Sequence, residues 1–267
     1  MSEEINYIHP GAKIASGVKL DGFVSIYDDV VIEEGAWIGS HVSIMPGARI
    51  GKNCRLFPGA VIASPGNDDI GKASGSPSVI IGESTTIREC VTVSRGSDEN
   101  HCTQIGSNVL IMAYAHVATN SRVGDRCILV NSVQLSNNVT VDDYAIVGGA
   151  SAVSESVKIG AHVMVSGGSM VTKDIPPYAK AGREPVVYSG INSIGLRRRG
   201  FTNEQINRIQ EVYRRLYLSG LTTGEAVDKI EKEIPDSMEK ESILSFISGS
   251  VRGIISVSKN FTINQNQ

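Results

Sequence analysis

The stretch between positions 116 and 138 combines one histidine with several short polar residues. His116 carries an imidazole, a side chain that can accept a proton near neutral pH. Thr119, Asn120, Asn137 and Asn138 are short, neutral and polar. They can hydrogen-bond to an oxyanion or to an incoming nucleophile, but they cannot act as a general base. This set of residues favours a site that works by proximity and hydrogen bonding.

The element that must position these residues is predicted by a six-residue repeat. Aliphatic residues recur at every sixth position in three runs, 14–62, 81–93 and 105–171, which hold nine, three and twelve hexads. A small or β-branched residue usually stands two positions earlier, and on a strand both side chains point to the same face. Such a repeat is typical of a parallel β-helix in which three hexads close one triangular coil, so we predict an all-β prism of about eight coils.

Two polar segments, 63–78 and 94–104, interrupt the six-residue period without shifting the pattern on either side. Interruptions of a repeat often carry function. We therefore expect both segments to be loops that project from the prism, towards a neighbouring subunit or over a cleft.

The pattern changes after Asp174, where a proline-containing segment precedes helical signals. Thr202 with Gln205 and Thr222 with Glu225 each form a capping box ahead of apolar residues at helical spacing. We predict a β-helix domain over 1–190, a small α-helical C-terminal domain over 191–257 and a flexible tail over 258–267.

Composition limits the classes of function. The net charge of −3 argues against a general nucleic-acid-binding protein. The four cysteines form no metal-type or redox pair, and none of the five histidines has metal-ligand spacing, so we expect no metal. The N-terminus lacks an apolar signal region, and no stretch reaches the roughly 18 apolar residues of a transmembrane helix. We expect a cytoplasmic protein without a membrane span.

Four motifs make the family resemblance specific: IGESTTIRECVTVSRG (81–96), AHV (115–117), IGAHVMVSGG (159–168) and REPVVYSGINSIGLRRRGF (183–201). With these motifs the chain resembles the bacterial UDP-N-acetylglucosamine O-acyltransferases that begin lipid A synthesis. The resemblance implies a left-handed β-helix, a homotrimer, and active sites in clefts between adjacent prisms. It also implies a nucleotide-sugar acceptor, an acyl-CoA or acyl carrier protein thioester as donor, and no permanently bound cofactor.

The same resemblance implies that the usual catalyst is missing. Members of the family carry a His-Asp pair where this chain has Thr119 and Asn120, and that His takes the proton from the sugar 3-hydroxyl. Two further family histidines would fall at Asn138 and Ser154. Of the histidine cluster only His116 remains, as an acceptor-binding group or as a structural hydrogen-bonding residue.

An amine acceptor would need no protein base. An amine with a pKa of about 7.7–8.0 is partly unprotonated at neutral pH and can attack a thioester directly. We therefore expect first an N-acyltransferase acting on a nucleotide-linked amino sugar. The alternatives are 3-O-acylation of UDP-N-acetylglucosamine with another residue as base, and a non-catalytic relative that binds a nucleotide sugar.

The resemblance also assigns binding residues outside this stretch. It places an acidic sugar contact at Asp68 or Asp69, and Glu155 could hold an ammonium group or lie in a solvated turn. For the nucleotide it implies Asn192, Arg198 and Arg199, although the arginines could instead form a salt-bridge cluster on a helix. Acyl-donor positions fall at Gly149 and Gly167, and Gly167 matches the acyl-length ruler of the family.

Overall fold

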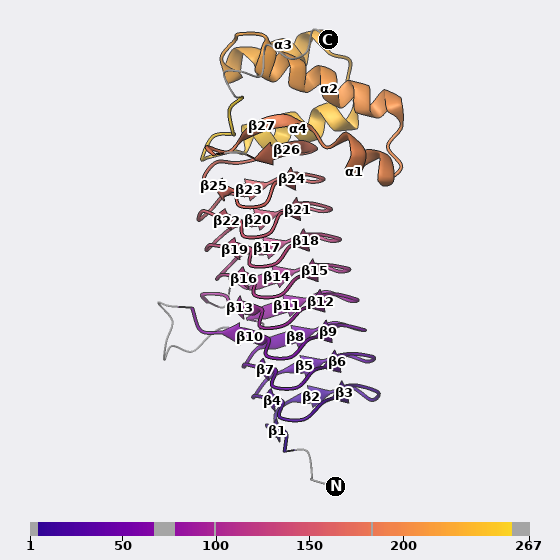
Figure 1. The fold of residues 1–267 in the computed structure, drawn as a ribbon, viewed down its shortest axis with the longest axis vertical. Coiled ribbons are helices and arrows are strands. Elements are labelled where there is room, and N and C mark those ends of the chain that lie inside the picture. Colours follow the sequence, from indigo (N-terminus) through magenta and orange to yellow (C-terminus); the bar gives the residue numbers. More distant parts are fainter. Residues whose placement is uncertain (1–4, 67–77, 99, 183, 258–267) are drawn as a thin grey trace.

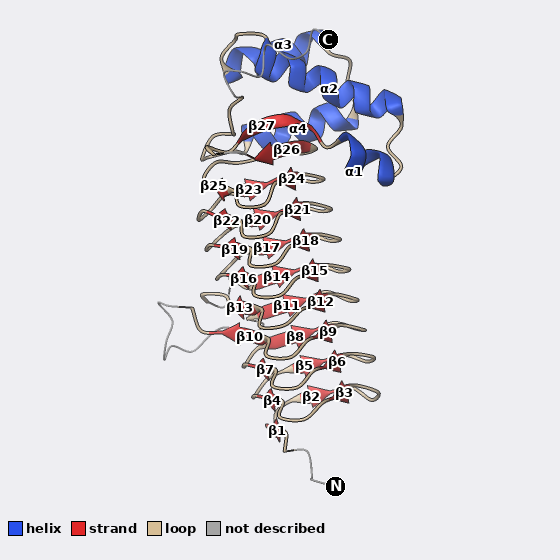
Figure 2. Ribbon diagram, viewed as in Figure 1, coloured by secondary structure: helices blue, strands red, loops and turns tan. Residues whose placement is uncertain are grey.

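The computed structural model describes residues 5–66, 78–98, 100–182 and 184–257. In this part of the chain, short parallel strands wind into a left-handed β-helix, and a helical region covers its C-terminal end (Figure 1). Figure 2 shows the same division, with strands stacked along the prism and the helices at one end. The predicted fold class is therefore confirmed.

Three parallel sheets form the walls of the prism, and successive strands pass from one sheet to the next. The nine-stranded sheet contains β1 (Tyr7–Ile8), β4 (Ser25–Ile26), β7 (Ser43–Ile44), β10 (Val61–Ser64), β13 (Thr92–Ser94), β16 (His116–Val117), β19 (Gln134–Leu135), β22 (Ala152–Val153) and β25 (Met170–Val171). The eight-stranded sheet contains β2 (Lys13–Ile14), β5 (Val31–Ile32), β8 (Ala48–Ile50), β11 (Val79–Ile81), β14 (Thr103–Ile105), β17 (Arg122–Val123), β20 (Thr140–Val141) and β23 (Lys158–Ile159).

The third sheet has ten strands and connects the prism to the helical region. It contains β3 (Lys19–Leu20), β6 (Trp37–Ile38), β9 (Arg55–Leu56), β12 (Thr86–Ile87), β15 (Leu110–Ile111), β18 (Ile128–Leu129), β21 (Ile146–Val147), β24 (Met164–Val165), β26 (Ala179–Gly182) and β27 (Val187–Ile191). The final pair, β26 and β27, is antiparallel and ends the sheet.

The core consists of stacked aliphatic side chains from the repeat. In β18, for example, Leu129 is fully buried and pairs in register with Ile111 of the preceding coil and Val147 of the next. Cys127, two residues before Leu129, is buried as well, as the period of a strand requires. The inward placement of both repeat positions is what the six-residue period predicted.

The strands on either side of the interruptions still pair in parallel, although the register of β10 against β13 shifts between Ile62 and Ser64. Val61 of β10 pairs with Thr92 of β13, and Val79 of β11 pairs with Thr103 of β14. Most of the first interruption lies outside the described residues. The second forms a short hairpin between β13 and β14, so the predicted projecting loop is present there.

The helical region contains α1 (Ser193–Arg198), α2 (Asn203–Leu218), α3 (Thr223–Glu233) and α4 (Met238–Ser248). Both predicted capping boxes are formed: Thr202 caps α2 with Gln205, and Thr222 caps α3 with Glu225. The Tyr213 side chain of α2 is buried, and its hydroxyl donates to the Pro177 carbonyl, which fixes this helix against the end of the prism. Among the described residues, no helix is long and apolar enough to cross a membrane.

Candidate functional site

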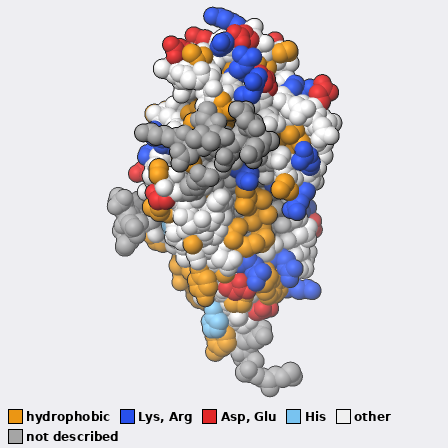
Figure 3. Space-filling model, turned by 45° about the horizontal axis from the view of Figure 1, so that its top comes forward, with side chains coloured by type: hydrophobic (Ala, Val, Ile, Leu, Met, Phe, Trp, Pro, Cys, Tyr) orange, Lys and Arg blue, Asp and Glu red, His pale blue; other side chains and the backbone are white. Residues whose placement is uncertain are grey.

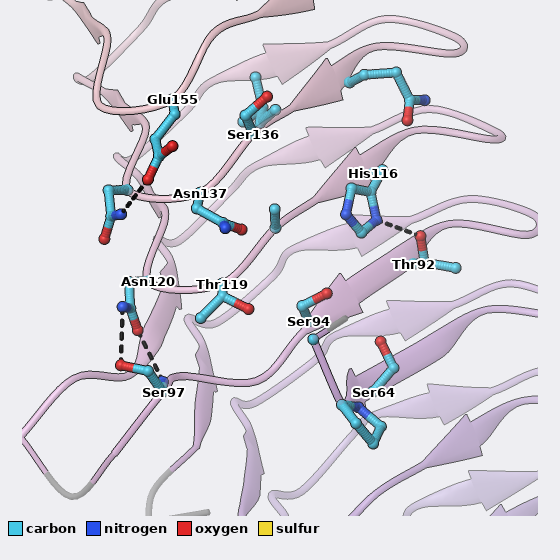
Figure 4. Close-up of a pocket in the computed structure, with 16 residues that line it drawn as sticks. Ser64, Thr92, Ser94, Ser97, His116, Thr119, Asn120, Ser136, Asn137 and Glu155 are labelled. Carbon is cyan, nitrogen blue, oxygen red and sulfur yellow. Dashed lines mark hydrogen bonds between the residues drawn. The ribbon is translucent and has the colours of Figure 1, made fainter. Parts of the chain in front are cut away.

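A polar cleft of about 840 Å³ lies on the outer face of the nine-stranded sheet (Figure 4). Its floor comes from equivalent positions of neighbouring strands, because Thr92, His116 and Gln134 pair in register. Their sequence neighbours Val93, Val117 and Leu135 point into the core, so these three side chains must point outward. Other residues that line the cleft are Ser64, Ser94, Ser97, Thr119, Asn120, Ser136, Asn137, Asn138 and Glu155.

The His116 imidazole is half-buried on the floor of the cleft. Its Nδ1 lies 2.7 Å from the hydroxyl oxygen of Thr92, a hydrogen bond in which either group can donate. Partial burial lowers the pKa of His116, so the neutral imidazole is favoured near pH 7. Figure 4 shows the other ring nitrogen on the side of the ring away from Thr92. A neutral imidazole in this position can accept or donate a proton.

The other four predicted catalytic residues, Thr119, Asn120, Asn137 and Asn138, line the same cleft as His116, at the turns that follow β16 and β19. Thr119 and Asn137 present a hydroxyl and an amide to the open space (Figure 4). Asn138 donates from its Nδ2 to Glu155 Oε1 over 3.3 Å, which brings a predicted substrate-binding carboxylate into the same wall. Asn120 also lines the cleft, and its amide is bonded to Ser97.

The structure adds cleft residues that the sequence analysis did not select. Thr92 orients His116, and Ser97 and Gln134 line the same space. Thr92 and Gln134 could have been found by counting outward repeat positions on either side of His116. Ser97 could not, because its place depends on how the hairpin folds back.

The residues predicted to bind the nucleotide lie at the junction of prism and helices, outside the lining of the cleft in one chain. Asn192 caps α1, and its Nδ2 donates to the His162 carbonyl over 2.9 Å. Arg199 donates to the Tyr144 carbonyl over 2.8 Å, whereas Arg198 is exposed. A nucleotide role for all three stays a prediction, and Arg198 is the best placed to reach a ligand.

The predicted acyl-donor residues Gly149 and Gly167 occupy successive coils. A Cβ atom added to Gly167 would lie 3.1 Å from the Gly149 carbonyl oxygen, so the two turns approach closely. Neither glycine is in the lining of the cleft in one chain, and their role stays a prediction. Asp68 and Asp69 lie outside the described residues. Within the described ranges, no group of three or more His, Cys, Asp or Glu is arranged to hold a metal ion.

An aromatic stack joins the prism to the helical region. The His162 ring stacks on Tyr144 at a centroid distance of 4.8 Å and on Tyr178 at 5.6 Å, and Phe201 packs edge-on. Burial and the nearby Arg199 guanidinium lower the pKa of His162 to about 4. His162 is therefore neutral and structural near pH 7.

This low pKa predicts a loss of stability in mild acid. In the unfolded chain His162 should protonate below about pH 6.5, while the folded form resists protonation until about pH 4. The free energy of unfolding should thus fall as the pH drops between these values. His162→Phe keeps an aromatic ring against Tyr144, Tyr178 and Arg199 but cannot titrate. As the pH is lowered, the urea midpoint of unfolding should fall less in this variant than in the native chain. If the midpoints of both proteins fell equally with decreasing pH, the low pKa of His162 would be contradicted.

Comparison with known proteins gives one consistent family. A model described as Udp N-acetylglucosamine O-acyltransferase, Domain 2, matches residues 174–255, and the bacterial transferase hexapeptide model matches 29–64 and 102–137. The acyl-[acyl-carrier-protein]–UDP-N-acetylglucosamine O-acyltransferase of Thermodesulfovibrio yellowstonii is 39% identical over 249 residues, covering 92% of this chain and 96% of that protein. The protein of the same name from Tolumonas auensis is 46% identical over 235 residues, covering 87% and 89%.

Solved structures agree with the sequence relatives. The UDP-N-acetylglucosamine acyltransferase of Bacteroides fragilis superposes with a TM-score of 0.91 at 43% identity, covering 96% of this chain and 100% of that chain. The corresponding enzyme of Francisella novicida superposes with a TM-score of 0.90 at 34% identity, covering 98% of each chain.

Proposed function

The chain belongs to the UDP-N-acetylglucosamine O-acyltransferase family, and from this premise we propose that it transfers an acyl group from acyl carrier protein to a hydroxyl group of a UDP-linked N-acetylated amino sugar. Transfer of an acyl group to a nucleotide sugar is the activity common to the family. The names of the relatives favour a hydroxyl acceptor over the amine acceptor that the sequence analysis placed first. The observation that carries the proposal is the neutral His116 imidazole on the floor of the cleft.

The proposed reaction uses His116 as the general base. Its free ring nitrogen takes the proton of the acceptor hydroxyl while the oxygen attacks the thioester carbonyl carbon. The resulting oxyanion accepts hydrogen bonds from neutral donors in the wall, and Asn137 and Thr119, which line the cleft, are the candidates. When the intermediate collapses, the C–S bond breaks and the thiolate takes the proton from the imidazolium. His116 is neutral again at the end of the cycle, and the products are the acylated nucleotide sugar and the free thiol of the donor.

An amine acceptor is the second candidate, and Glu155 favours it. This carboxylate lies in the cleft wall and is fixed by Asn138, so it could attract an ammonium group. The amine would have to lose its proton before attack and would not need His116.

Product analysis tests the proposed function. The purified chain should be incubated with UDP-N-acetylglucosamine and with a UDP-linked 3-amino sugar, each with acetyl-CoA and with acyl carrier proteins of several chain lengths. Mass spectrometry should detect an ester of UDP-N-acetylglucosamine with an acyl carrier protein donor. An amide product alone would establish the second candidate. Tight nucleotide-sugar binding without any product would indicate a non-catalytic relative.

We further propose that the chain works as a homotrimer. The nine-stranded sheet that carries the cleft also exposes apolar side chains, including Tyr7 of β1 and Met170 of β25, which are 51% and 54% exposed. Figure 3 shows apolar side chains gathered along one face of the prism. A second prism would bury such a surface and close the open side of the cleft. Sedimentation at micromolar concentration should give the mass of a trimer, and a monomer would contradict a site shared between subunits.

Arg198 is expected to bind the diphosphate of the acceptor. Charge-assisted hydrogen bonds of this kind contribute about 1.5–3 kcal/mol, so Arg198→Ala should weaken binding roughly ten- to a hundredfold. Arg197 is also exposed on α1 and is not assigned to the nucleotide, so Arg197→Ala is the matched control. Calorimetry with the UDP-sugar should separate the two variants, whereas equal affinities would assign Arg198 to a structural role.

A further inference from the structure

The hairpin between β13 and β14 stands at the edge of the cleft. We use the name hairpin for Ser97, Asp98, Asn100 and His101, since Glu99 lies outside the described residues. Asp98 and His101 form an antiparallel bridge. The base is closed tightly, because a Cβ atom on Gly96 would collide with the His101 carbonyl oxygen. Ser97 is the hairpin residue that lines the cleft.

Asn120 holds this hairpin with both ends of its side-chain amide. The Ser97 backbone N–H donates to Asn120 Oδ1 over 2.9 Å, and Asn120 Nδ2 donates to Ser97 Oγ over 3.0 Å (Figure 4). The backbone N–H of Asn120 in turn donates to Thr103 Oγ1 over 3.0 Å, at the start of β14. The Asn120 amide is thus directed at the hairpin and not at the open space of the cleft.

The hairpin is also braced internally. The Asp98 carboxylate accepts from the Ser97 hydroxyl over 3.1 Å, from the Asn100 backbone N–H over 2.8 Å, and contacts His101 Nδ1 at 2.8 Å. These bonds lower the pKa of Asp98, so the carboxylate is charged near neutral pH. Asn120 therefore joins the cleft wall to the hairpin through its two hydrogen bonds to Ser97.

We propose that Asn120 is a positioning residue that latches the hairpin against the cleft as a preformed wall for the nucleotide-sugar acceptor. The inference rests on the proposed function, since it assigns a role within the same cleft. Thr119, the neighbour of Asn120, presents its hydroxyl to the reaction space, so the hairpin borders the part of the cleft where the acceptor would react. A wall that is already ordered spares the acceptor the entropic cost of ordering it on binding.

The test uses Asn120→Gly with Asn108→Gly as the matched control. Asn120 and Asn108 both have left-handed backbone conformations, with φ of 60° and 56°, so glycine fits either position without new strain. Asn108 is exposed and lies outside the lining of the cleft. The control therefore removes an asparagine side chain from the same backbone conformation without touching the latch. Asn120→Asp is the conservative variant, because a carboxylate oxygen can still accept from the Ser97 N–H.

Loss of the two latch bonds should raise the acceptor KM roughly tenfold, with kcat and the donor KM changed less than about twofold. Amide hydrogen exchange in the hairpin should become faster in Asn120→Gly and stay as in the native chain in Asn108→Gly. Asn120→Asp should recover part of the lost affinity. An unchanged acceptor KM, an effect on kcat alone, or an equal effect in the control would overturn the proposal.

Failure of the proposed function can be told apart from failure of the latch. Calorimetric titration of UDP-N-acetylglucosamine needs no turnover, so it compares Asn120→Gly with the native chain even if no acyl product forms. Binding weakened roughly tenfold in the variant, with no product from either protein, would support the latch and reject the activity. Equal binding would reject the latch whatever the activity.

Discussion

Replacing His116 by glutamine should lower kcat for hydroxyl acylation about 10²–10⁴-fold, with little change in the acceptor KM. Glutamine keeps a polar side chain on the floor of the cleft but cannot take a proton from a hydroxyl group near pH 7. Steady-state kinetics with UDP-N-acetylglucosamine and acyl carrier protein donors measures the effect. The loss should appear in kcat because proton transfer takes place in the transition state and not in substrate binding.

Thr92→Val is the graded companion to this substitution. It removes the hydroxyl that lies 2.7 Å from His116 Nδ1 but leaves the imidazole in place. Its effect on kcat should be smaller than that of His116→Gln, because an orienting hydrogen bond is lost and not the base itself. If His116→Gln retained most of the native kcat, the imidazole would be a structural group and another residue or the acceptor would supply the base.

Leu129→Ala should lower the free energy of unfolding by about 2–5 kcal/mol. Leu129 is fully buried in β18 between Ile111 and Val147, in a stack where neighbouring coils cannot move independently to fill a cavity. Equilibrium urea unfolding followed by circular dichroism measures the change. Because each coil packs only on its neighbours, the loss should be accompanied by local opening of adjacent coils.

Leu221→Ala provides the control for that measurement. Leu221 lies between α2 and α3 and is 38% exposed, so its truncation should change stability by less than about 0.5 kcal/mol. A similar loss in the two variants would mean that the stacked aliphatic interior does not dominate the stability of the prism.

The fold was predictable because the spacing of inward-facing residues within each six-residue repeat is visible directly in the sequence. A buried residue such as Leu129 and its companion Cys127 lie on one inward face, and the described repeat pairs from Val24 and Ile26 to Ser169 and Val171 are buried in the same way. The capping boxes of α2 and α3 were equally local signals, since Thr202 and Gln205 are only one helical turn apart. Patterns of this kind need no knowledge of distant contacts.

The candidate site was only partly predictable. His116 and Thr119 could be selected because their residue types and positions in the repeat are visible in the sequence. The bond between Asn120 and Ser97 could not, because it joins residues that are far apart in the chain and depends on the path of the hairpin. The contacts of Asn192 were equally invisible in the sequence. Its side chain caps α1 and donates to the His162 carbonyl, and the predicted nucleotide role remains untested.

The amine acceptor was favoured at first because Thr119 cannot act as a base. The sequence also left open hydroxyl acylation with another residue as the base. The structure places the His116 imidazole in the same cleft, hydrogen-bonded to Thr92 and with its pKa lowered by burial, so under the proposed function a base does not require a histidine at position 119. The two candidate reactions therefore differ in how the acceptor loses its proton: a hydroxyl group would give it to His116, whereas an amine would lose it to solvent before the attack.

The pH dependence of kcat/KM for acyl transfer to UDP-N-acetylglucosamine tests this central claim most directly. With His116 as base, the rate should rise as the imidazole loses its proton and level off at a lower pH than an ordinary histidine would give, because burial lowers the pKa of His116. His116→Gln should remove this titration from any residual activity. A rate that is undetectable with this acceptor, while transfer to a 3-amino sugar climbs through about pH 7.7–8.0 as a free amine would, would contradict the account.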